Sequence, residues 1–449
     1  MRAFVLACSL FLVSCTVGPN YRRPAIAPPA VYRGEIQGDS SPASLGDEKW
    51  WTVFQDETLQ KLIHTALAQN YDVRIAATRI LQAQARLGIT RADQYPNVSG
   101  SLSFNAQRIP FGTFDATQLQ GALSYDLDFW GRYRRATEAA RANLLASEWN
   151  ERTVTSTLVS SVAASYFQLR ELDLELEISE RTLASRRQSL QLTETLANGG
   201  ATSLLDVKQA QQLVETAAAA ISSLQLEIAQ AENALTSLLG EYPADVARGK
   251  ALTDQPLPAV VPAGLPSRLL ERRPDIQAAE QTLIASNAQI GVARAQLFPD
   301  VSLTGSGGGA AISLSRLTSI YTFTPAITQP IFTAGRLRAN VRLSEAQQQQ
   351  QLLTYQQTIQ TAFREVADSL AGYQRNRESR EHQELLTAAA RDASGLSDMR
   401  YRGGATSYLE VLTSETNLFA AELNLARGRL AERLSLVQLY NSLGGGWQQ

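Results

Sequence analysis

The sequence predicts an α+β membrane protein built from one helix-and-strand unit that occurs twice. Three observations support this fold class: long stretches that contain no proline and read as helices, four shorter segments in which polar and apolar residues alternate, and a repeat that relates the two halves of the chain. The 449 residues include 41 basic and 43 acidic ones, and this net charge of −2 argues against nucleic acid as a partner.

The N-terminus reads as a bacterial lipoprotein signal. Arg2 precedes an apolar run over residues 3–13, which is too short to span a bilayer in the mature protein. The sequence LVSC at 12–15 is similar to a lipobox, which predicts a signal peptide at 1–14 and a covalent lipid on Cys15. The alternative is an ordinary signal peptide followed by an incidental cysteine. We expect no cofactor besides this lipid, and several acyl chains would attach the protein stably to outer-membrane lipid.

Two pairs of segments show the internal repeat. The sequence at 72–99 aligns without gaps to 275–302, and NGGATSLLDV at 198–207 aligns to RGGATSYLEV at 402–411. Duplication of one half explains these matches. The mature chain therefore divides into a lipidated N-terminal segment (15–70), a first repeat (71–240), a linker (241–274), a second repeat (275–441) and a C-terminal tail (442–449).

Each repeat is expected to contain a helix, two strands and two longer helices, in that order. Pro96 ends the first helix because proline cannot continue it, and Gly199-Gly200 ends the long helix. The expected helices are 71–94, 134–197 and 203–239, then 275–296, 336–401 and 406–441. The expected strands are 97–109, 117–130, 299–306 and 321–332, with the glycine-rich run 305–309 as part of a turn or a flexible strand end.

Apolar residues spaced seven apart predict that the long helices pack side by side with other helices. This ladder contains Val162, Leu169, Leu176, Leu183 and Leu190 in the first repeat and Leu352, Ile359, Val366 and Tyr373 in the second. A simple coiled-coil rod would show the same ladder, but it would not need the strands.

Strict alternation marks the strands, as in NVSGSLSFNAQ at 97–107, where Leu102 and Phe104 share one face and Ser101 and Ser103 the other. A half-buried soluble sheet alternates in the same way. The lipoprotein signal and segment lengths of about 10–13 residues favour strands that cross an outer membrane at a tilt. Four strands cannot close a barrel and open edges cannot face lipid, so several copies must combine their strands; three copies of four strands give twelve.

Six phrases, in order along nearly the entire mature chain, carry a family resemblance. They are CTVGPNYRRP (15–24), WWTVFQDETLQKLIHTALAQN (50–70), LDFWGR (127–132), LPSRLLERRPDIQAAE (265–280), FPDVSLT (298–304) and PIFTAGRLRA (330–339). Together they resemble the TolC-like outer-membrane efflux channels, in the lipoprotein branch that serves resistance-nodulation-division (RND) pumps.

The resemblance implies a homotrimer with a twelve-stranded β-barrel, a long α-helical periplasmic barrel and a mixed equatorial girdle. Segments 16–60, 240–266 and the C-terminal tail are expected to supply the girdle. The resemblance also implies a location in the Gram-negative outer membrane, and two partners: a periplasmic adaptor (membrane fusion) protein and an inner-membrane RND pump. The channel would be the exit duct of this tripartite system, passively conducting drugs or other small toxic compounds. The alternative is the same architecture serving metal-ion or type I protein export.

The resemblance also implies a periplasmic gate where the helix pairs reverse direction, at 198–206 and 402–410. Asp206 and Tyr401 match positions of the family's latch, and Glu410 matches an aspartate of its acidic ring. Thr406 and Thr413 depart from the pattern, because some relatives have a latch arginine and a second ring aspartate there. A hydrogen bond from the Tyr401 hydroxyl to Asp206 is the expected replacement. The alternative is that Asp206 only caps a helix.

No enzyme site or metal site is expected from the sequence. The two histidines, His64 and His382, have no cysteine or second histidine at ligand spacing, and structural or solvated roles suit both. No nucleophile elbow or phosphate-binding loop occurs. The rival classes are an envelope enzyme, which needs a convergent site, and a structural rod, which does not need amphipathic strands.

Overall fold

Residues 16–34, 43–110, 112–256, 261–312 and 317–448 are described by the computed structural model of this chain. The predicted signal peptide and Cys15 lie outside these residues. The chain divides into two compact units, and each contains segments of both repeats. The first unit comprises residues up to Ile26, 77–150 and 275–358, and the second comprises 27–76, 151–274 and 359–449.

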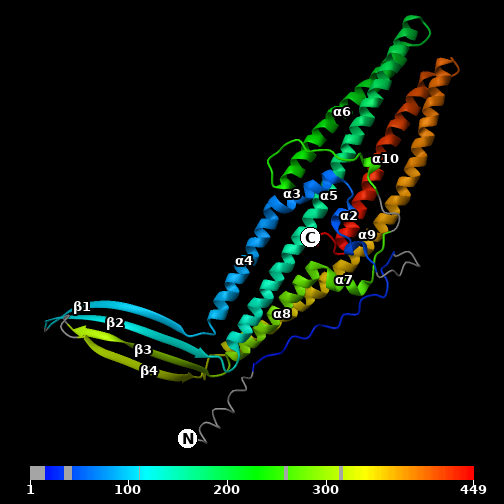
Figure 1. Cartoon of the computed structure of the whole chain (residues 1–449). Helices are drawn as coiled ribbons and strands as arrows, with labels where there is room; N and C mark the ends of the chain where they lie inside the picture. The colour runs from blue at the N-terminus through cyan, green and yellow to red at the C-terminus, as the bar shows by residue number, and fades with distance from the viewer. Residues whose placement is uncertain (1–15, 35–42, 111, 257–260, 313–316, 449) are drawn as a thin grey trace. The chain divides into compact units, whose positions relative to one another are not determined.

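The two repeats fold into matching series of elements (Figure 1). The first repeat forms α4 (Tyr71–Ala92), β1 (Asn97–Ile109), β2 (Gly112–Leu127), α5 (Arg132–Asn198) and α6 (Leu204–Leu239). The second forms α8 (Pro274–Ala295), β3 (Asp300–Ile312), β4 (Leu317–Thr328), α9 (Arg336–Arg402) and α10 (Tyr408–Ser442). The long helices α5 and α9 have 67 residues each. The duplicated half predicted from the sequence is therefore confirmed.

The predicted helix ends agree with the structure to within two residues. Helix α6 begins with a capping box, in which Ser203 accepts a hydrogen bond from the backbone of Asp206 and the Asp206 side chain accepts one from the backbone of Ser203. It ends at Gly240, whose φ of 77° is a left-handed conformation that favours glycine. Local sequence signals thus determine where these helices begin and end.

Three strands differ from their predicted bounds. Strand β3 continues through the glycine run to Ile312, because residues 305–309 pair with both β2 and β4. The prediction of a turn or flexible strand end at 305–309 was therefore wrong. Strand β2 starts at Gly112, earlier than predicted. Strand β4 also starts early, at Leu317, and ends at Thr328.

The four strands form one antiparallel sheet in the first unit, in the order β1-β2-β3-β4 (Figure 1). A Cβ atom added to Gly308 would overlap the carbonyl oxygen of Leu119, so glycine lets β2 and β3 approach closely at this point. Strands β1 and β4 are the edges, and neither has a second neighbour within the described part of the chain.

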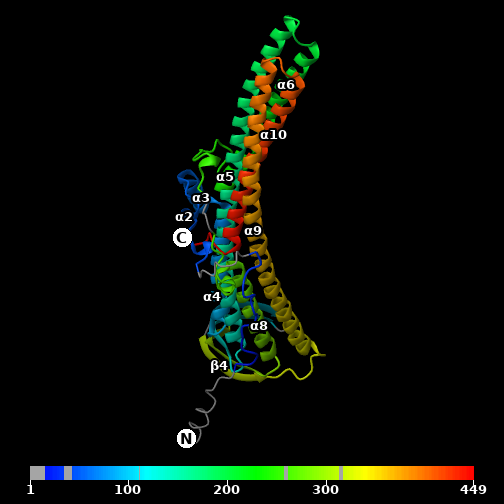
Figure 2. The ribbon, with the colours of Figure 1, turned by 90° about the vertical axis from the view of Figure 1, so that its right-hand side faces the viewer.

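The long helices form two pairs in the second unit, where α5 lies beside α6 and α9 beside α10 in both views (Figures 1 and 2). We call α5–α6 the first hairpin and α9–α10 the second hairpin. The predicted ladder is largely interior: Val162, Leu169 and Val366 are completely buried, and Ile359 nearly so. Side-by-side helix packing is therefore confirmed.

Shorter elements pack against the long helices of the second unit. They are η1 (Leu45–Asp47), α2 (Trp50–Val53), α3 (Glu57–Gln69), η2 (Leu252–Asp254) and α7 (Pro266–Arg272). Helix α3 packs against α6, and both η1 and η2 pack against α10. The buried carboxylate of Asp56 accepts hydrogen bonds from the Tyr166 hydroxyl (2.9 Å), the Gln255 amide (2.6 Å) and the backbone of Lys250 (3.0 Å). These bonds hold residues from before and between the repeats against α5.

Residues 16–23 form a strap across α8 in the first unit. The Val17 backbone donates to the Trp130 carbonyl at 3.1 Å, and Arg23 forms an ion pair with Glu280 of α8 at 2.8 Å. Where strap and helix cross, a Cβ atom on Gly18 would lie 2.5 Å from the Cα of Gly291. Gly18 also has a φ of 106°, so close approach and backbone conformation both require glycine here.

Candidate functional site

The register of the sheet joins the alternating strands into one continuous apolar face. Val98 lies opposite Leu123, Leu123 opposite Gly305, and Gly305 opposite Phe323, and residues opposite each other point to the same face. Leu102 is 71% exposed, a high value for a leucine in a four-stranded sheet. A large uncovered apolar surface of this kind marks contact with lipid or another protein.

The opposite face of the sheet is mainly polar. Ser101 lies opposite Gln120, and the hydroxyls of Ser306 and Thr322 hydrogen bond at 2.7 Å. Ile320 is an exception, because it shares the face of Thr322. The face assignment predicted for 97–107 is therefore confirmed by the pairing.

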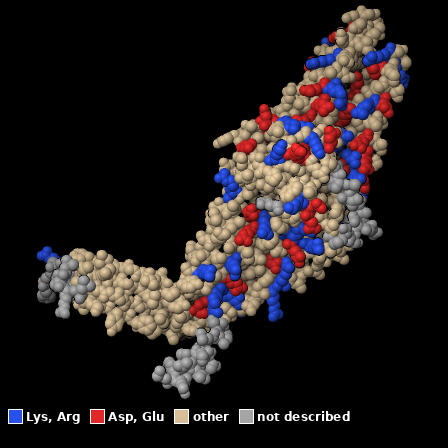
Figure 3. Space-filling view, viewed as in Figure 1, with Lys and Arg blue, Asp and Glu red and all other residues tan. Residues whose placement is uncertain are grey.

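Charged residues are confined to the strand ends. The uncharged spans are 97–107 in β1, 116–125 in β2, 301–312 in β3 and 317–328 in β4. The space-filling view shows the same contrast, with a sheet surface almost free of charge and helices rich in both signs (Figure 3). Spans of this length suit a tilted crossing of a bilayer. Among the described helices, none is both long and apolar enough to cross a membrane.

Aromatic side chains mark the sheet end that adjoins the helices. The Trp130 and Phe298 rings stack at 4.7 Å between centroids, and Trp130 Nε1 donates to the carbonyl of Pro299 at 2.8 Å. The Tyr133 hydroxyl donates to Asp126 at 2.8 Å. Rings with an apolar body and a polar atom are typical of the boundary between membrane and water.

The predicted latch between Tyr401 and Asp206 is not formed within the described chain. Asp206 accepts hydrogen bonds from Thr202 and from the backbone of Ser203, and these bonds lower the pKa of its carboxyl. Asp206 thus completes the capping box of α6, which was the alternative interpretation. The Tyr401 hydroxyl is buried and has no hydrogen-bond partner among the described residues. Its ring packs against that of Tyr408 at 5.4 Å between centroids.

Glu410 has a partner that the sequence analysis missed. Arg400, in the last turn of α9, forms an ion pair with Glu410 at 3.2 Å, and the Thr406 hydroxyl donates to the same carboxylate. Arg400 therefore supplies positive charge on the second hairpin, although position 406 lacks the expected arginine. This ion pair could have been predicted from the sequence, because a basic residue ends one helix and an acidic residue lies in the first turn of the next, across a short loop. Thr413 donates to the Leu409 carbonyl of its own helix at 2.8 Å.

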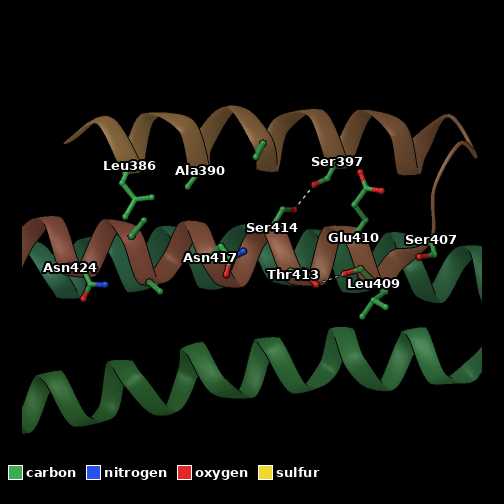
Figure 4. Close-up of a pocket in the computed structure, with 13 residues that line it drawn as sticks. Leu386, Ala390, Ser397, Ser407, Leu409, Glu410, Thr413, Ser414, Asn417 and Asn424 are labelled. Carbon is green, nitrogen blue, oxygen red and sulfur yellow. Dashed lines mark hydrogen bonds between the residues drawn. The ribbon is translucent and has the colours of Figure 1, made fainter. Parts of the chain in front are cut away.

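A groove runs along the second hairpin beside these residues (Figure 4). Its volume is about 810 Å³, and it lies between α9 and α10. Glu410 and Thr413 line it together with small side chains, among them Ala390 of α9 and Ala420 of α10. Small side chains allow another helix to approach closely.

The described residues contain no group of three or more His, Cys, Asp or Glu side chains that could hold a metal ion. His64 packs edge-on against Trp50, with 4.9 Å between ring centroids, and His382 is exposed on α9.

The comparison with protein families decides between a channel, an envelope enzyme and a structural rod. A family model described as outer membrane efflux protein matches residues 62–241 and 265–445, which is most of the chain. The chain belongs to the outer membrane efflux protein family. As an outer membrane efflux protein, it is a transport channel of the Gram-negative outer membrane and not an enzyme.

Relatives and solved structures agree with this assignment. The efflux protein is 39% identical to the cation efflux system protein CusC of Escherichia coli O6:H1, over 98% of each chain. It is 38% identical to the probable efflux pump outer membrane protein TtgC of Pseudomonas putida, over 99% of this chain and 95% of TtgC. The open-state MtrE outer membrane channel of Neisseria gonorrhoeae matches with a TM-score of 0.88 at 31% identity, covering 97% of this chain and 99% of that one. The predicted fold class is confirmed.

Proposed function

We propose that three copies of this chain form the exit duct of a tripartite RND efflux system. The observation that carries the proposal is the sheet, whose apolar face is continuous over four strands and whose edges β1 and β4 both lack a neighbour within the described chain. An edge in lipid leaves backbone groups unsatisfied, at a cost of several kcal/mol each. Three sheets joined edge to edge satisfy these groups as a twelve-stranded barrel.

The proposed anchor is a covalent lipid on Cys15. The strap supports this proposal, because it holds the next residue, Thr16, close to Gly131 at the sheet end that carries Trp130. An acyl chain attached one residue earlier would enter the membrane beside the aromatic side chains.

The proposed partners are a periplasmic adaptor protein and an inner-membrane RND pump. The groove on the second hairpin suits a helix of the adaptor, since most of its lining side chains are small and its volume is about 810 Å³. The proposed cargo is drugs or other small toxic organic compounds. TtgC is named as part of an efflux pump and CusC as part of a cation efflux system, so metal-ion export is the second candidate.

Planar-bilayer recording and efflux in cells test the duct. We expect the purified protein to migrate as a trimer and to conduct ions, and its gene to restore dye and antibiotic efflux to a strain that lacks its own outer channel. A monomer that never conducts would contradict the proposal. Restored resistance to toxic metal cations, without restored dye efflux, would favour the metal candidate.

A pair of alanines on α9 tests the docking groove. Ala390 lines the groove, whereas Ala388 is exposed outside it. We expect Ala390→Trp to lower drug efflux and adaptor binding while leaving trimer assembly and conductance unchanged. Ala388→Trp is the matched control and should behave as wild type. Equal loss in both variants would contradict docking at the groove.

The double variant Asp206→Ala with Tyr401→Phe tests the remaining form of the predicted latch. The two side chains do not bond within one described chain, so a latch between them must form between copies. An increase in resting conductance would support such an intermolecular latch. Unchanged conductance would leave Asp206 as a helix cap only.

A further inference from the structure

A second groove lies among the helices of the first unit, and we call it the arginine groove. Its volume is about 620 Å³, and residues of α4, α5 and α8 line it. Helix α4 contributes Arg79 and Arg86, and helix α5 contributes the polar side chains of Asn143 and Ser147. None of the described residues that line it is acidic. The arginine groove is therefore a polar space whose only formal charges are positive.

The two arginines of this groove have no counter-ion in the described part of the chain. They are seven residues apart, so they share one face of α4 and are separated by about 10 Å along the helix axis. Both are exposed, and neither guanidinium forms a hydrogen bond or an ion pair with a described residue. By contrast, Arg134 in the same unit pairs with Asp128 at 3.2 Å. Two unpaired guanidinium groups attract anions, and each can hold a carboxylate or phosphate through two parallel hydrogen bonds.

The internal repeat shows that the fold does not require these charges. The alignment of 72–99 with 275–302 places Thr282 at the position of Arg79 and Gln289 at the position of Arg86. Helix α8 therefore has the same length as α4 without either charge. Gln289 lines the arginine groove as well, so equivalent positions of the two repeats meet at one site. A role in binding explains the arginines better than a role in folding.

The arginine groove opens on the side of α8 that faces away from the strap. Gln289 is the only exposed residue of α8, a helix described over its whole length, whereas the Asn287 side chain donates to the Pro19 carbonyl of the strap at 2.9 Å. Side chains two residues apart on a helix point about 200° apart, so Gln289 lies opposite the strap. The strap follows Cys15 directly, and acyl chains on Cys15 must reach lipid. The strap therefore belongs to the outer wall of the proposed duct, and the groove belongs to its inner wall.

We propose that the arginine groove is an anion-binding site on the inner wall of the duct, and that the cargo includes small compounds with a carboxylate, phosphate or sulfonate group. This site depends on the duct function proposed above and adds the chemical class of the cargo. Three copies would place six arginines around the lumen, and rings of basic side chains favour anions in pores. Because both arginines are exposed to water, an ion pair with the cargo is weak enough to release it.

Dye binding to the purified protein tests the groove. The probe is carboxyfluorescein, a small fluorescent polyanion, and fluorescence anisotropy at low salt reports its binding. The double variant Arg79→Thr with Arg86→Gln gives α4 the residues that α8 has at these positions. We expect its dissociation constant for the dye to rise about tenfold, because hydrogen bonds to charged groups are lost. Arg91→Gln, on an exposed arginine of α4 outside the groove, is the matched control and should bind the dye as the wild type does.

Reversal potentials under a salt gradient test whether the site faces the lumen. The double variant should be more cation-selective than the wild type, because positive charge is removed from the wall of the pore. Arg91→Gln should keep the wild-type selectivity. If the double variant fails to assemble, Arg86→Gln alone should change dye binding and selectivity in the same directions by smaller amounts.

The two measurements separate failure of the site from failure of the duct. Wild-type dye binding in the double variant, or an equal loss of binding in Arg91→Gln, would overturn the anion site. Lost dye binding with an unchanged reversal potential would overturn its position on the inner wall. A wild-type protein that binds the dye but neither conducts ions nor supports drug efflux would instead overturn the duct.

Discussion

At the ends of the two hairpins, one sequence motif produces two side-chain arrangements. Thr202 and Thr406 each donate a hydrogen bond to an acid four residues later. The shorter acid, Asp206, folds back to cap its own helix. The longer acid, Glu410, reaches Arg400 on the neighbouring helix. Leu196 aligns with Arg400 in the first hairpin, so Asp206 has no cation at that position, and the same threonine–acid pair gives a local cap in one hairpin and a contact between helices in the other.

Opposite effects are expected when the two partners of the Glu410 ion pair are removed singly. Both side chains are substantially exposed, so the pair stabilises the fold by about 0–1 kcal/mol and its main effect is electrostatic. Glu410→Gln should lower cation selectivity and weaken block by multivalent cations, and Arg400→Gln should raise both. Reversal potentials under a salt gradient measure the cation selectivity of each variant. A change of selectivity in the same direction in both variants would contradict this prediction.

Asp206 and Tyr401 should differ in their effect on stability. Asp206→Ala removes a capping box and should lower the free energy of unfolding by about 1 kcal/mol. Tyr401→Phe removes a buried hydroxyl that has no partner in the described chain, so stability should stay unchanged or rise. Thermal unfolding in detergent compares the two variants. A large loss in Tyr401→Phe would reveal an intermolecular partner.

For single strands, the two faces should respond differently to charge. Leu102→Arg places a cation on the apolar face, and this should cost about 2–4 kcal/mol near the bilayer midplane. Ser103→Arg, the adjacent residue on the polar face, should be tolerated. Assembly yield in outer membranes and heat-modified gel mobility measure the outcome. Failure of Ser103→Arg alongside a normal Leu102→Arg would mean that the faces are inverted.

A buried acid on α5 should make the helices sensitive to pH. Burial raises the pKa of Glu171 to about 8, and repulsion from Glu175 adds to this shift, while Arg427 of α10 opposes it and Glu227 adds to it. Arg427 forms an ion pair with Glu175 at 2.8 Å. The folded state therefore binds more protons than the unfolded state between about pH 4.5 and 8, and stability should fall as the pH rises through this window.

Glu171→Gln should flatten this pH dependence. The variant should show a higher thermal midpoint than wild type at pH 9 and little difference at pH 5. Glu177→Gln, on an exposed acid of the same helix, is the control and should retain the wild-type slope. A wild-type midpoint that does not fall between pH 6 and pH 9 would argue against a proton on Glu171.

Sequence reasoning succeeded where local chemistry determines structure. Proline, glycine and capping residues fixed the helix ends, and alternation fixed the faces of the sheet. It failed at 305–309, because backbone pairing with two neighbours keeps a glycine run extended in spite of its weak strand preference. It also missed the Arg400 partner of Glu410, since that contact depends on how α9 lies beside α10.

Across the whole molecule, lipid attachment can be tested apart from assembly. Cys15→Ser removes the proposed acceptor, so incorporation of labelled palmitate should be lost. The strap and the sheet do not involve the Cys15 side chain, and the trimer should still form in the outer membrane. Palmitate that remains on the variant would contradict a lipid at this position.

The strap across α8 also sets an order of events during biogenesis. Residues 16–23 are synthesised among the first, yet the partners of Pro19 and Arg23 on α8 come 268 and 257 positions later. Closing so long a loop is slow and entropically costly. The contacts of Pro19 and Arg23 with α8 therefore cannot form until well over half of the protein has been made, although Val17 and Asn20 can pair earlier with Trp130 and Arg135. A periplasmic chaperone that binds this segment would delay completion of the first unit until α8 has arrived.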